Sequence, residues 1–189
     1  YVLQRFGVPV PRMCTDVNPK VRNVDYRRID GISRDTSMRA AWEIMRDQQI
    51  DTLAVVDDTR ELEGLITVKG IAMANMDVFD NRVLAKSRTT YRNILSTLNG
   101  TMLVGSEDSV CDERARVIIG AASPELLENT IQSGDIVILS NRYESQLCAI
   151  EMEASLIIVC QGAKVGKTIV KLAEENGVAI MSVPCDTYA

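Results

Sequence analysis

The order of elements between residues 31 and 71 constrains the fold of this 189-residue chain more than any other feature. A strand leads to Asp35 or Thr36, either of which is suited to cap a helix. Apolar residues then recur at helical spacing, at Ala40, Ala41, Ile44 and Met45. Two strands follow, at 52–56 and 64–68, joined by a charged turn. The stretch therefore predicts a β-α-β-β unit whose helix buries one face, followed by a further helix from Ile71 to Phe79.

The second half of the chain alternates helices and strands. Strands are predicted at 101–104, 117–120, 135–139, 156–160 and 178–183, and helices at 91–98, 123–132, 142–151 and 165–175. Thr89 or Thr90 is placed to cap the first of these helices, and Asn176-Gly177 suits a left-handed end for the last. Continuous apolar strands that alternate with helices indicate an α/β fold with a mostly parallel sheet, covered on both faces.

Composition and charge exclude several classes of protein. The net charge is −5 and the basic residues are scattered among acids, so a nucleic-acid-binding surface is not indicated. No apolar run is long enough to span a bilayer, and nothing at the start resembles a signal peptide, so a cytoplasmic protein without a membrane partner is expected. Since the chain begins at Tyr1 rather than Met, we expect a piece of a longer protein.

The chain has no histidine and five cysteines. Without histidine there is no Ser-His-Asp triad and no Cys-His dyad, and a zinc site is disfavoured. No two cysteines have Cys-x-x-Cys spacing, so reduced thiols are expected, with Cys148 and Cys160 in the core. No catalytic residue and no metal ligand is therefore predicted in this chain.

Two segments that follow buried strands can be interpreted either as binding sites or as purely structural elements. Residues 162–168 resemble a phosphate-binding loop, but three residues rather than four separate Gly162 from Gly166, which favours a tight strand-to-helix turn or a weak anion contact at a helix N-terminus. Arg142 and Tyr143 follow the strand at 135–139, where parallel sheets bind ligands. We favour a subunit interface for these two side chains over a pocket.

The unit at 31–71, with its terminal Gly64-Leu-Ile-Thr, resembles one CBS module. The resemblance implies an adenine-nucleotide site in which a short strand faces the purine and a hydroxyl at a strand end faces ribose or phosphate oxygens. The matching residues are Ile32, Asp51, Thr52, Leu53, Ala54, Thr67, Lys69 and Gly70. Ordinary packing is the competing interpretation of each. The family often has an aspartate that binds ribose where Gly70 stands, and Asp51 places a negative charge near the expected phosphate.

The order of the remaining segments extends the resemblance over the whole chain. A Phe6-Gly-Val-Pro entry precedes the CBS-like unit, and Asp80 to Ser87 follows it. The second half then carries Gly134 to Leu139, Asn141-Arg142, Gly162 to Val165 and Pro184 to Tyr188. Together they resemble the regulatory insert of a CBS-containing family II inorganic pyrophosphatase. The implied organisation is an entry segment and first CBS module at 1–85 and a DRTGG domain at 86–189.

The family resemblance implies that this piece is not itself an enzyme. In the family, a catalytic DHH domain holds Mn²⁺, Co²⁺ or Mg²⁺ and hydrolyses pyrophosphate, while the insert binds adenine nucleotides. AMP and ADP inhibit, ATP or diadenosine polyphosphates activate, and the DRTGG domain contributes to a homodimer. A second CBS module, expected after residue 189, would complete the nucleotide site, and no cofactor is expected in this chain. Two alternatives stay open, a structural dimerisation module with a degenerate CBS unit and the DRTGG segment of a phosphate acetyltransferase.

Overall fold

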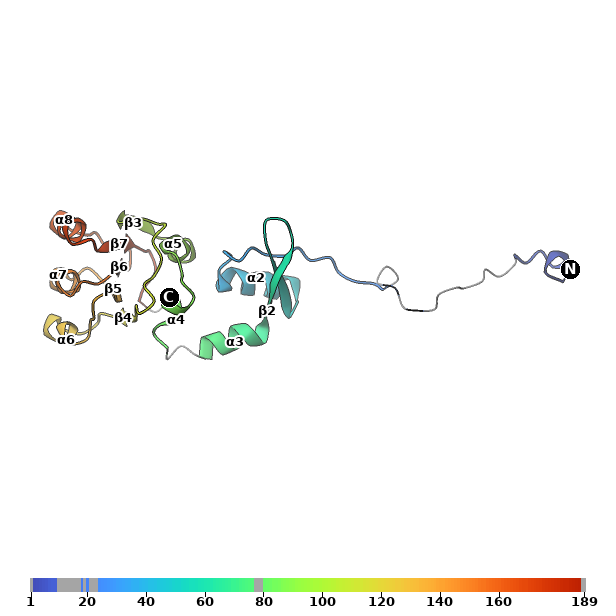
Figure 1. Cartoon of the computed structure of the whole chain (residues 1–189), viewed down its shortest axis with the longest axis horizontal. Coiled ribbons are helices and arrows are strands. Elements are labelled where there is room, and N and C mark those ends of the chain that lie inside the picture. The colour runs from blue at the N-terminus through green and yellow to red at the C-terminus, as the bar shows by residue number, and fades with distance from the viewer. Residues whose placement is uncertain (1, 10–17, 19, 21–23, 77–79, 188–189) are drawn as a thin grey trace. The chain divides into compact units, whose positions relative to one another are not determined.

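The computed structural model describes residues 2–9, 18, 20, 24–76 and 80–187, and the chain divides into one unit at 1–30 and another at 31–189. In the first unit, α1 (Val2–Arg5) is a single helical turn without a buried residue (Figure 1). The rest of the predicted entry segment falls mainly on residues 10–17, 19 and 21–23, and the predicted helix end at Phe79 falls on 77–79. Both lie outside the described residues.

The first helix of the second unit, α2 (Met38–Gln48), starts later than the sequence indicates. Ser37 is its N-cap and accepts a hydrogen bond from the Ala40 amide at 3.2 Å. Prediction of Asp35 or Thr36 as the cap is wrong, because these residues belong to a preceding turn in which the Thr36 amide donates to the Ser33 carbonyl at 3.0 Å. Because Asp35 and Thr36 are part of this turn, the helix begins only at Met38.

The two strands after α2 form an antiparallel pair, β1 (Thr52–Val56) with β2 (Leu62–Thr67). Ile32 forms an isolated parallel bridge to Val55 on the other edge of β1. This bridge stands where the sequence predicts a first strand. Helix α3 (Val68–Met76) starts directly after β2, three residues before the predicted Ile71. The small core of this part is made by Ile32, Ala41, Met45, Leu53 and Ile71.

Gly31 fits a place where two segments approach closely. A Cβ atom at this position would lie 2.7 Å from Val56 Cγ1 and 2.9 Å from Val56 Cγ2. The bridge at Ile32 holds the segment there, since the Ile32 amide donates to the Ala54 carbonyl and the Val56 amide donates to the Ile32 carbonyl, each at 2.9 Å. Glycine is therefore the residue that lets the bridge form without displacing Val56.

The second half forms a five-stranded sheet in the order β3-β7-β6-β5-β4. The strands are β3 (Thr101–Val104), β4 (Val117–Ile119), β5 (Ile136–Leu139), β6 (Leu156–Val159) and β7 (Ala179–Ser182). Strands β4 to β7 are parallel and β3 is antiparallel to β7. This confirms the mostly parallel sheet that the alternating pattern predicts.

Helices cover both faces of this sheet. Helices α6 (Pro124–Glu128), α7 (Tyr143–Glu151) and α8 (Lys167–Asn176) cover one face, and α4 (Val83–Lys86) and α5 (Tyr91–Leu98) lie on the other (Figure 1). Each face has its own apolar cluster. Thr90 caps α5 by accepting from the Asn93 amide at 3.2 Å, and Gly177 ends α8 with a φ of 69°. Both caps agree with the sequence prediction.

Helix α6 ends at Glu128, four residues before the predicted end. Side-chain donors replace the next helical amides at this point, since Asn129 Nδ2 donates to the Glu125 carbonyl and Thr130 Oγ1 donates to the Leu126 carbonyl, each at 2.8 Å. Polar side chains of this kind compete with the helix for its own carbonyls. The predicted N-terminus at Ser123-Pro124 is correct in position, although Ser123 makes no side-chain cap bond.

A buried ion pair fixes the entry into β4 and β5. The Asp135 carboxylate is 2 % exposed and accepts from Arg116 through the backbone amide at 3.1 Å, Nε at 3.1 Å and Nη2 at 2.5 Å. The Gln132 amide adds a fourth bond at 2.8 Å. Burial by itself raises the pKa of Asp135, but these hydrogen bonds outweigh it and hold the pKa below its ordinary value.

Within the described residues, no helix is long and apolar enough to cross a bilayer.

Candidate functional site

The face of the β1–β2 pair that points away from α2 and α3 carries several of the predicted nucleotide-binding residues. Thr52 lies opposite Thr67, and Ala54 lies opposite Leu65. Side chains alternate between the two faces of a strand, so these four share one face while Leu53 faces the core. Leu65 is 62 % exposed. This face therefore offers apolar surface next to two hydroxyl groups, which suits the ring and the sugar or phosphate of a nucleotide.

The start of α3 adds polar groups at the end of this face. The Thr67 hydroxyl oxygen accepts from the Gly70 amide at 3.0 Å, and the Val68 amide donates to the Asp51 carbonyl at 3.1 Å. The hydroxyl hydrogen of Thr67 remains for another acceptor, such as a phosphate oxygen. Lys69 is exposed beside it. Because helix N-termini favour anions, the Lys69 ammonium and the Thr67 hydroxyl at this point suit a phosphate group.

Two of the predicted residues have their side chains in the core. Leu53 is 1 % exposed and Ile32 is 8 % exposed. The backbone amide and carbonyl of Ile32 are also both used, in the bridge to Ala54 and Val56. Leu53 and Ile32 thus support the site from behind, while Asp51, Thr52, Ala54, Thr67, Lys69 and Gly70 lie where a ligand could meet them.

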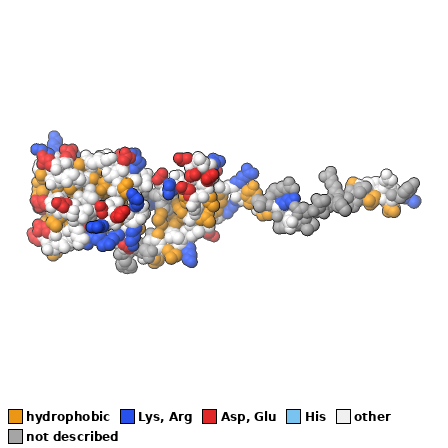
Figure 2. Space-filling view, viewed as in Figure 1, with side chains coloured by type: hydrophobic (Ala, Val, Ile, Leu, Met, Phe, Trp, Pro, Cys, Tyr) orange, Lys and Arg blue, Asp and Glu red, His pale blue; other side chains and the backbone are white. Residues whose placement is uncertain are grey.

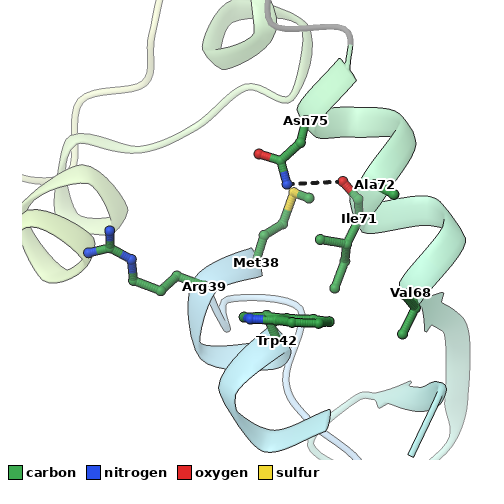
Figure 3. Close-up of a pocket in the computed structure, with 7 residues that line it drawn as sticks. All are labelled: Met38, Arg39, Trp42, Val68, Ile71, Ala72 and Asn75. Atoms are coloured by element: carbon green, nitrogen blue, oxygen red, sulfur yellow. Dashed lines mark hydrogen bonds between the residues drawn. The ribbon is translucent and has the colours of Figure 1, made fainter. Parts of the chain in front are cut away.

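A cavity in this part of the chain lies elsewhere, between α2 and α3 (Figure 3). It has a volume of about 430 Å³ and is lined by Met38, Arg39, Trp42, Val68, Ile71, Ala72 and Asn75. Asn75 is fixed by a hydrogen bond from its Nδ2 to the Ile71 carbonyl at 3.2 Å, and Ile71 points toward the indole of Trp42. We refer to this cavity as the α2–α3 groove. It lies on the helical side of the sheet, away from Thr52 and Thr67.

Sequence reasoning missed the α2–α3 groove, although a signal was present. Met38 and Trp42 lie on α2 outside the predicted buried stripe, and both remain exposed, Trp42 by 42 %. Met73 and Met76 of α3 are also exposed, although neither lines the groove, and hydrophobic side chains are visible over this part of the chain in Figure 2. Large apolar side chains exposed on two neighbouring helices are typical of a surface that meets another protein segment.

The predicted interface pair separates into two roles. Arg142 Nη2 donates to the carbonyls of Ala121 and Ala122 at 3.0 and 3.4 Å, so its guanidinium holds the loop after β4 against the start of α7. Arg142 is also exposed but has this internal role, whereas the Tyr143 side chain is 46 % exposed.

The loop that resembles a phosphate-binding motif is a strand-to-helix connection, from the end of β6 at Val159 to the start of α8 at Lys167. The Gly162 amide donates to the Val183 carbonyl at 2.8 Å, so this amide serves the fold. No group of three or more His, Cys, Asp or Glu side chains that could hold a metal ion occurs in the part of the chain that the structure describes.

Comparison with known proteins agrees with this architecture. A model of the DRTGG domain matches residues 93–189, and a model of the CBS domain matches residues 21–77. The chain belongs to the DRTGG domain family and carries a CBS domain before it. The sequence prediction of a CBS module followed by a DRTGG domain is thereby confirmed.

Two curated relatives of this DRTGG-family chain are inorganic pyrophosphatases. The cobalt-dependent inorganic pyrophosphatase of Clostridium perfringens is 33 % identical over 192 residues, and a probable manganese-dependent inorganic pyrophosphatase of Thermotoga maritima is 23 % identical over 195 residues. Both alignments cover 100 % of this chain and 34 % of the relative. The chain thus spans about a third of the length of these relatives.

A solved structure resembles this CBS–DRTGG chain closely. It contains the CBS and DRTGG domains of the regulatory region of the Clostridium perfringens pyrophosphatase, complexed with the activator diadenosine tetraphosphate. The TM-score is 0.81 at 32 % sequence identity, and the match covers 90 % of this chain and 74 % of that chain.

Proposed function

We propose that this chain is the adenine-nucleotide-sensing regulatory region of a family II inorganic pyrophosphatase. The observation that carries the proposal is the match over 90 % of the chain to a pyrophosphatase regulatory region that binds diadenosine tetraphosphate. In the proposed parent protein, a DHH catalytic domain with Mn²⁺ or a similar metal ion hydrolyses pyrophosphate in the cytoplasm. AMP and ADP inhibit it, and ATP or diadenosine polyphosphates activate it.

The binding surface proposed here is the outer face of β1 and β2 with the first turn of α3. Ala54 and Leu65 provide apolar cover for a base, and the Thr67 hydroxyl and the Lys69 ammonium meet phosphate oxygens. Since Gly70 supplies no carboxylate at this turn, we infer that phosphate contacts contribute more than ribose contacts. A single CBS module offers one side of such a site, and a second CBS module of the parent protein supplies the other.

Regulation requires the ligand to bind two arrangements of the parent protein with different affinities. Inhibition by AMP and activation by a dinucleotide then reflect two ligands that prefer opposite arrangements. A dinucleotide can span two adenine sites, whereas AMP fills one at a time. The opposite signs therefore follow if the distance between paired sites differs between the two arrangements.

Calorimetric titration of AMP and of diadenosine tetraphosphate into the chain tests binding directly. We expect saturable heat, and about tenfold weaker binding for Lys69→Ala, since a charge-assisted contact to phosphate contributes about 1.4 kcal/mol or more. Lys171→Ala, which removes an exposed lysine of α8, is the matched control and should bind as the unchanged chain does. If neither ligand gives heat with this chain or with a chain extended past Ala189, nucleotide sensing by this region is refuted.

The second candidate is a structural dimerisation module. The exposed apolar surface of the α2–α3 groove favours it, because this surface suits a second copy of the chain, as does exposed Tyr143. Light scattering after gel filtration should then show a dimer that Trp42→Glu converts to a monomer. Thr67→Val in the parent enzyme separates the candidates, because an unchanged nucleotide response would leave dimerisation as the role of the region.

A further inference from the structure

Two cysteines that are 25 positions apart in the sequence meet at the carboxyl ends of β6 and β7. Cys160 directly follows β6, and Cys185 lies three residues after β7. Their segments are joined by two hydrogen bonds, from the Gln161 amide to the Cys185 carbonyl and from the Gly162 amide to the Val183 carbonyl, each at 2.8 Å.

The backbone at this junction has an uncommon conformation. Gln161 and Gly162 are consecutive residues with positive φ, 63° and 59°. A non-glycine residue such as Gln161 adopts this region at a cost. The turn presents both amides to the segment after β7, and the two hydrogen bonds compensate for that cost. The contact between the two segments is therefore specifically held.

The hydrogen bond limits the distance between the two cysteines. The Gln161 nitrogen is two covalent bonds from the Cys160 Cα, and the Cys185 oxygen is two covalent bonds from its own Cα. The two Cα atoms consequently lie no more than about 7.6 Å apart. This upper limit is slightly above the Cα–Cα range of about 4.4–6.8 Å that disulfides usually span. Both side chains also pack into the same apolar cluster, on the α4–α5 side of the sheet.

The pair combines an accessible thiol with a protected one. Cys185 is partly exposed, Cys160 is 2 % exposed, and both are free thiols in the structure. Burial, and then the neighbouring Cys185 and Asp186, raise the pKa of Cys160. Cys160 therefore stays protonated and unreactive toward solvent, and a reagent meets Cys185 first.

We propose that Cys160 and Cys185 form a reversible disulfide, with a small-molecule disulfide of the glutathione class as the oxidant. The Cys185 thiolate attacks one sulfur of the small disulfide, and a free small thiolate leaves. Cys160 then attacks the Cys185 sulfur, and the second small thiolate leaves and takes up the Cys160 proton. Two protein thiols have lost two electrons and two protons, and the small disulfide has gained two electrons.

The disulfide would connect the turn after β6 covalently to the segment after β7. Residues 183–186 could then not separate from the turn, even when their hydrogen bonds break. The other described cysteines are less suited to pair with Cys185. Cys148 belongs to the cluster on the opposite face of the sheet, and the Cys111 amide bonds to the Thr89 carbonyl rather than to the segment after β7.

The test incubates the full chain with oxidised glutathione at pH 8, alkylates the remaining thiols and maps disulfide-linked peptides by mass spectrometry. We expect loss of two of the five thiols, a peptide pair linked through Cys160 and Cys185, and full recovery with dithiothreitol. Oxidation should also raise the unfolding temperature, because the crosslink restricts the unfolded chain.

Two variants make the assignment specific. In Cys185→Ser, Cys160 should remain a free thiol that the alkylating reagent reaches only after unfolding. Oxidation should then no longer raise the unfolding temperature. Cys111→Ser is the matched control from the same cluster and should retain the Cys160–Cys185 link. The proposal is overturned if all five thiols persist, if Cys185 stays a glutathione adduct, or if Cys185 links to Cys14, Cys111 or Cys148 instead.

Discussion

Replacement of Asp135 by asparagine isolates the contribution of the buried ion pair beside β5. The substitution keeps the shape but removes the charge, and an amide nitrogen cannot accept the bonds that Arg116 and Gln132 donate to both carboxylate oxygens. Breaking a buried ion pair by removing one partner costs about 3–5 kcal/mol. The Arg116 side chain is 19 % exposed and regains some water, so we expect the lower end, about 3 kcal/mol.

Urea denaturation of the chain, followed by far-UV circular dichroism, measures this loss. In thermal unfolding of a domain of about 100 residues, such as the DRTGG domain, a loss of about 3 kcal/mol corresponds to a decrease in melting temperature of more than 10 °C. Asp108→Asn is the matched control, because its side chain is 80 % exposed and its ion pair with Arg92 lies at the surface. Its stability should be nearly unchanged. Equal stability of Asp135→Asn and the unchanged chain would refute the assignment of Asp135 as a stabilising carboxylate.

The same carboxylate predicts a pH dependence. Because the folded-state pKa of Asp135 is lowered, its contribution is fully present above the unfolded pKa of about 3.9. It is lost as the pH falls through the lower folded-state pKa. Acid titration of the unchanged chain should show this loss of stability, and Asp135→Asn should show a smaller one. The same acid slope in both proteins would contradict the prediction.

Five further substitutions test single features of the fold. Ser145→Ala should stabilise the chain by about 1 kcal/mol, since the buried Ser145 Oγ has no hydrogen-bond partner among the described residues, whereas Ser155→Ala should destabilise it by removing a 2.7 Å bond to the Gly134 carbonyl. Gly31→Ala should cost about 1–3 kcal/mol through the contact with Val56, while Gly64→Ala, which meets nothing within 4 Å, should cost far less. Thr90→Ala should cost about 1 kcal/mol through the lost cap of α5. Chemical denaturation measures all five, and a reversed order within the serine pair or the glycine pair would show that the contact has been misjudged.

Local patterns predicted most elements because the same residues that favour an element also fill its place in the fold. The strand at 52–56 and the helix at 91–98 have their predicted bounds, and Thr90 and Gly177 act as the predicted caps. Boundaries failed where polar side chains compete with the backbone. Ser33 draws Asp35 and Thr36 into a turn, and Asn129 and Thr130 bond back to α6.

The candidate site divides in the same way. The sequence resemblance assigned Thr52, Ala54 and Thr67 to one site, and the register of β1 and β2 places them on one face. Only the packing of the strands against the helices shows that Leu53 points into the core, because alternation separates it from Thr52 and Ala54 without saying which face is buried.

The sequence by itself determined the order of elements, the parallel sheet and the family, because these depend on hydrophobic period and on local motifs. The tertiary structure decided which distant residues meet. The ion pair of Arg116 with Asp135, the α2–α3 groove around Trp42 and the approach of Cys160 to Cys185 each join segments that no local pattern connects. Such contacts form only when strands and helices pack against one another, so their partners are fixed by the whole sheet and not by the neighbours in the chain.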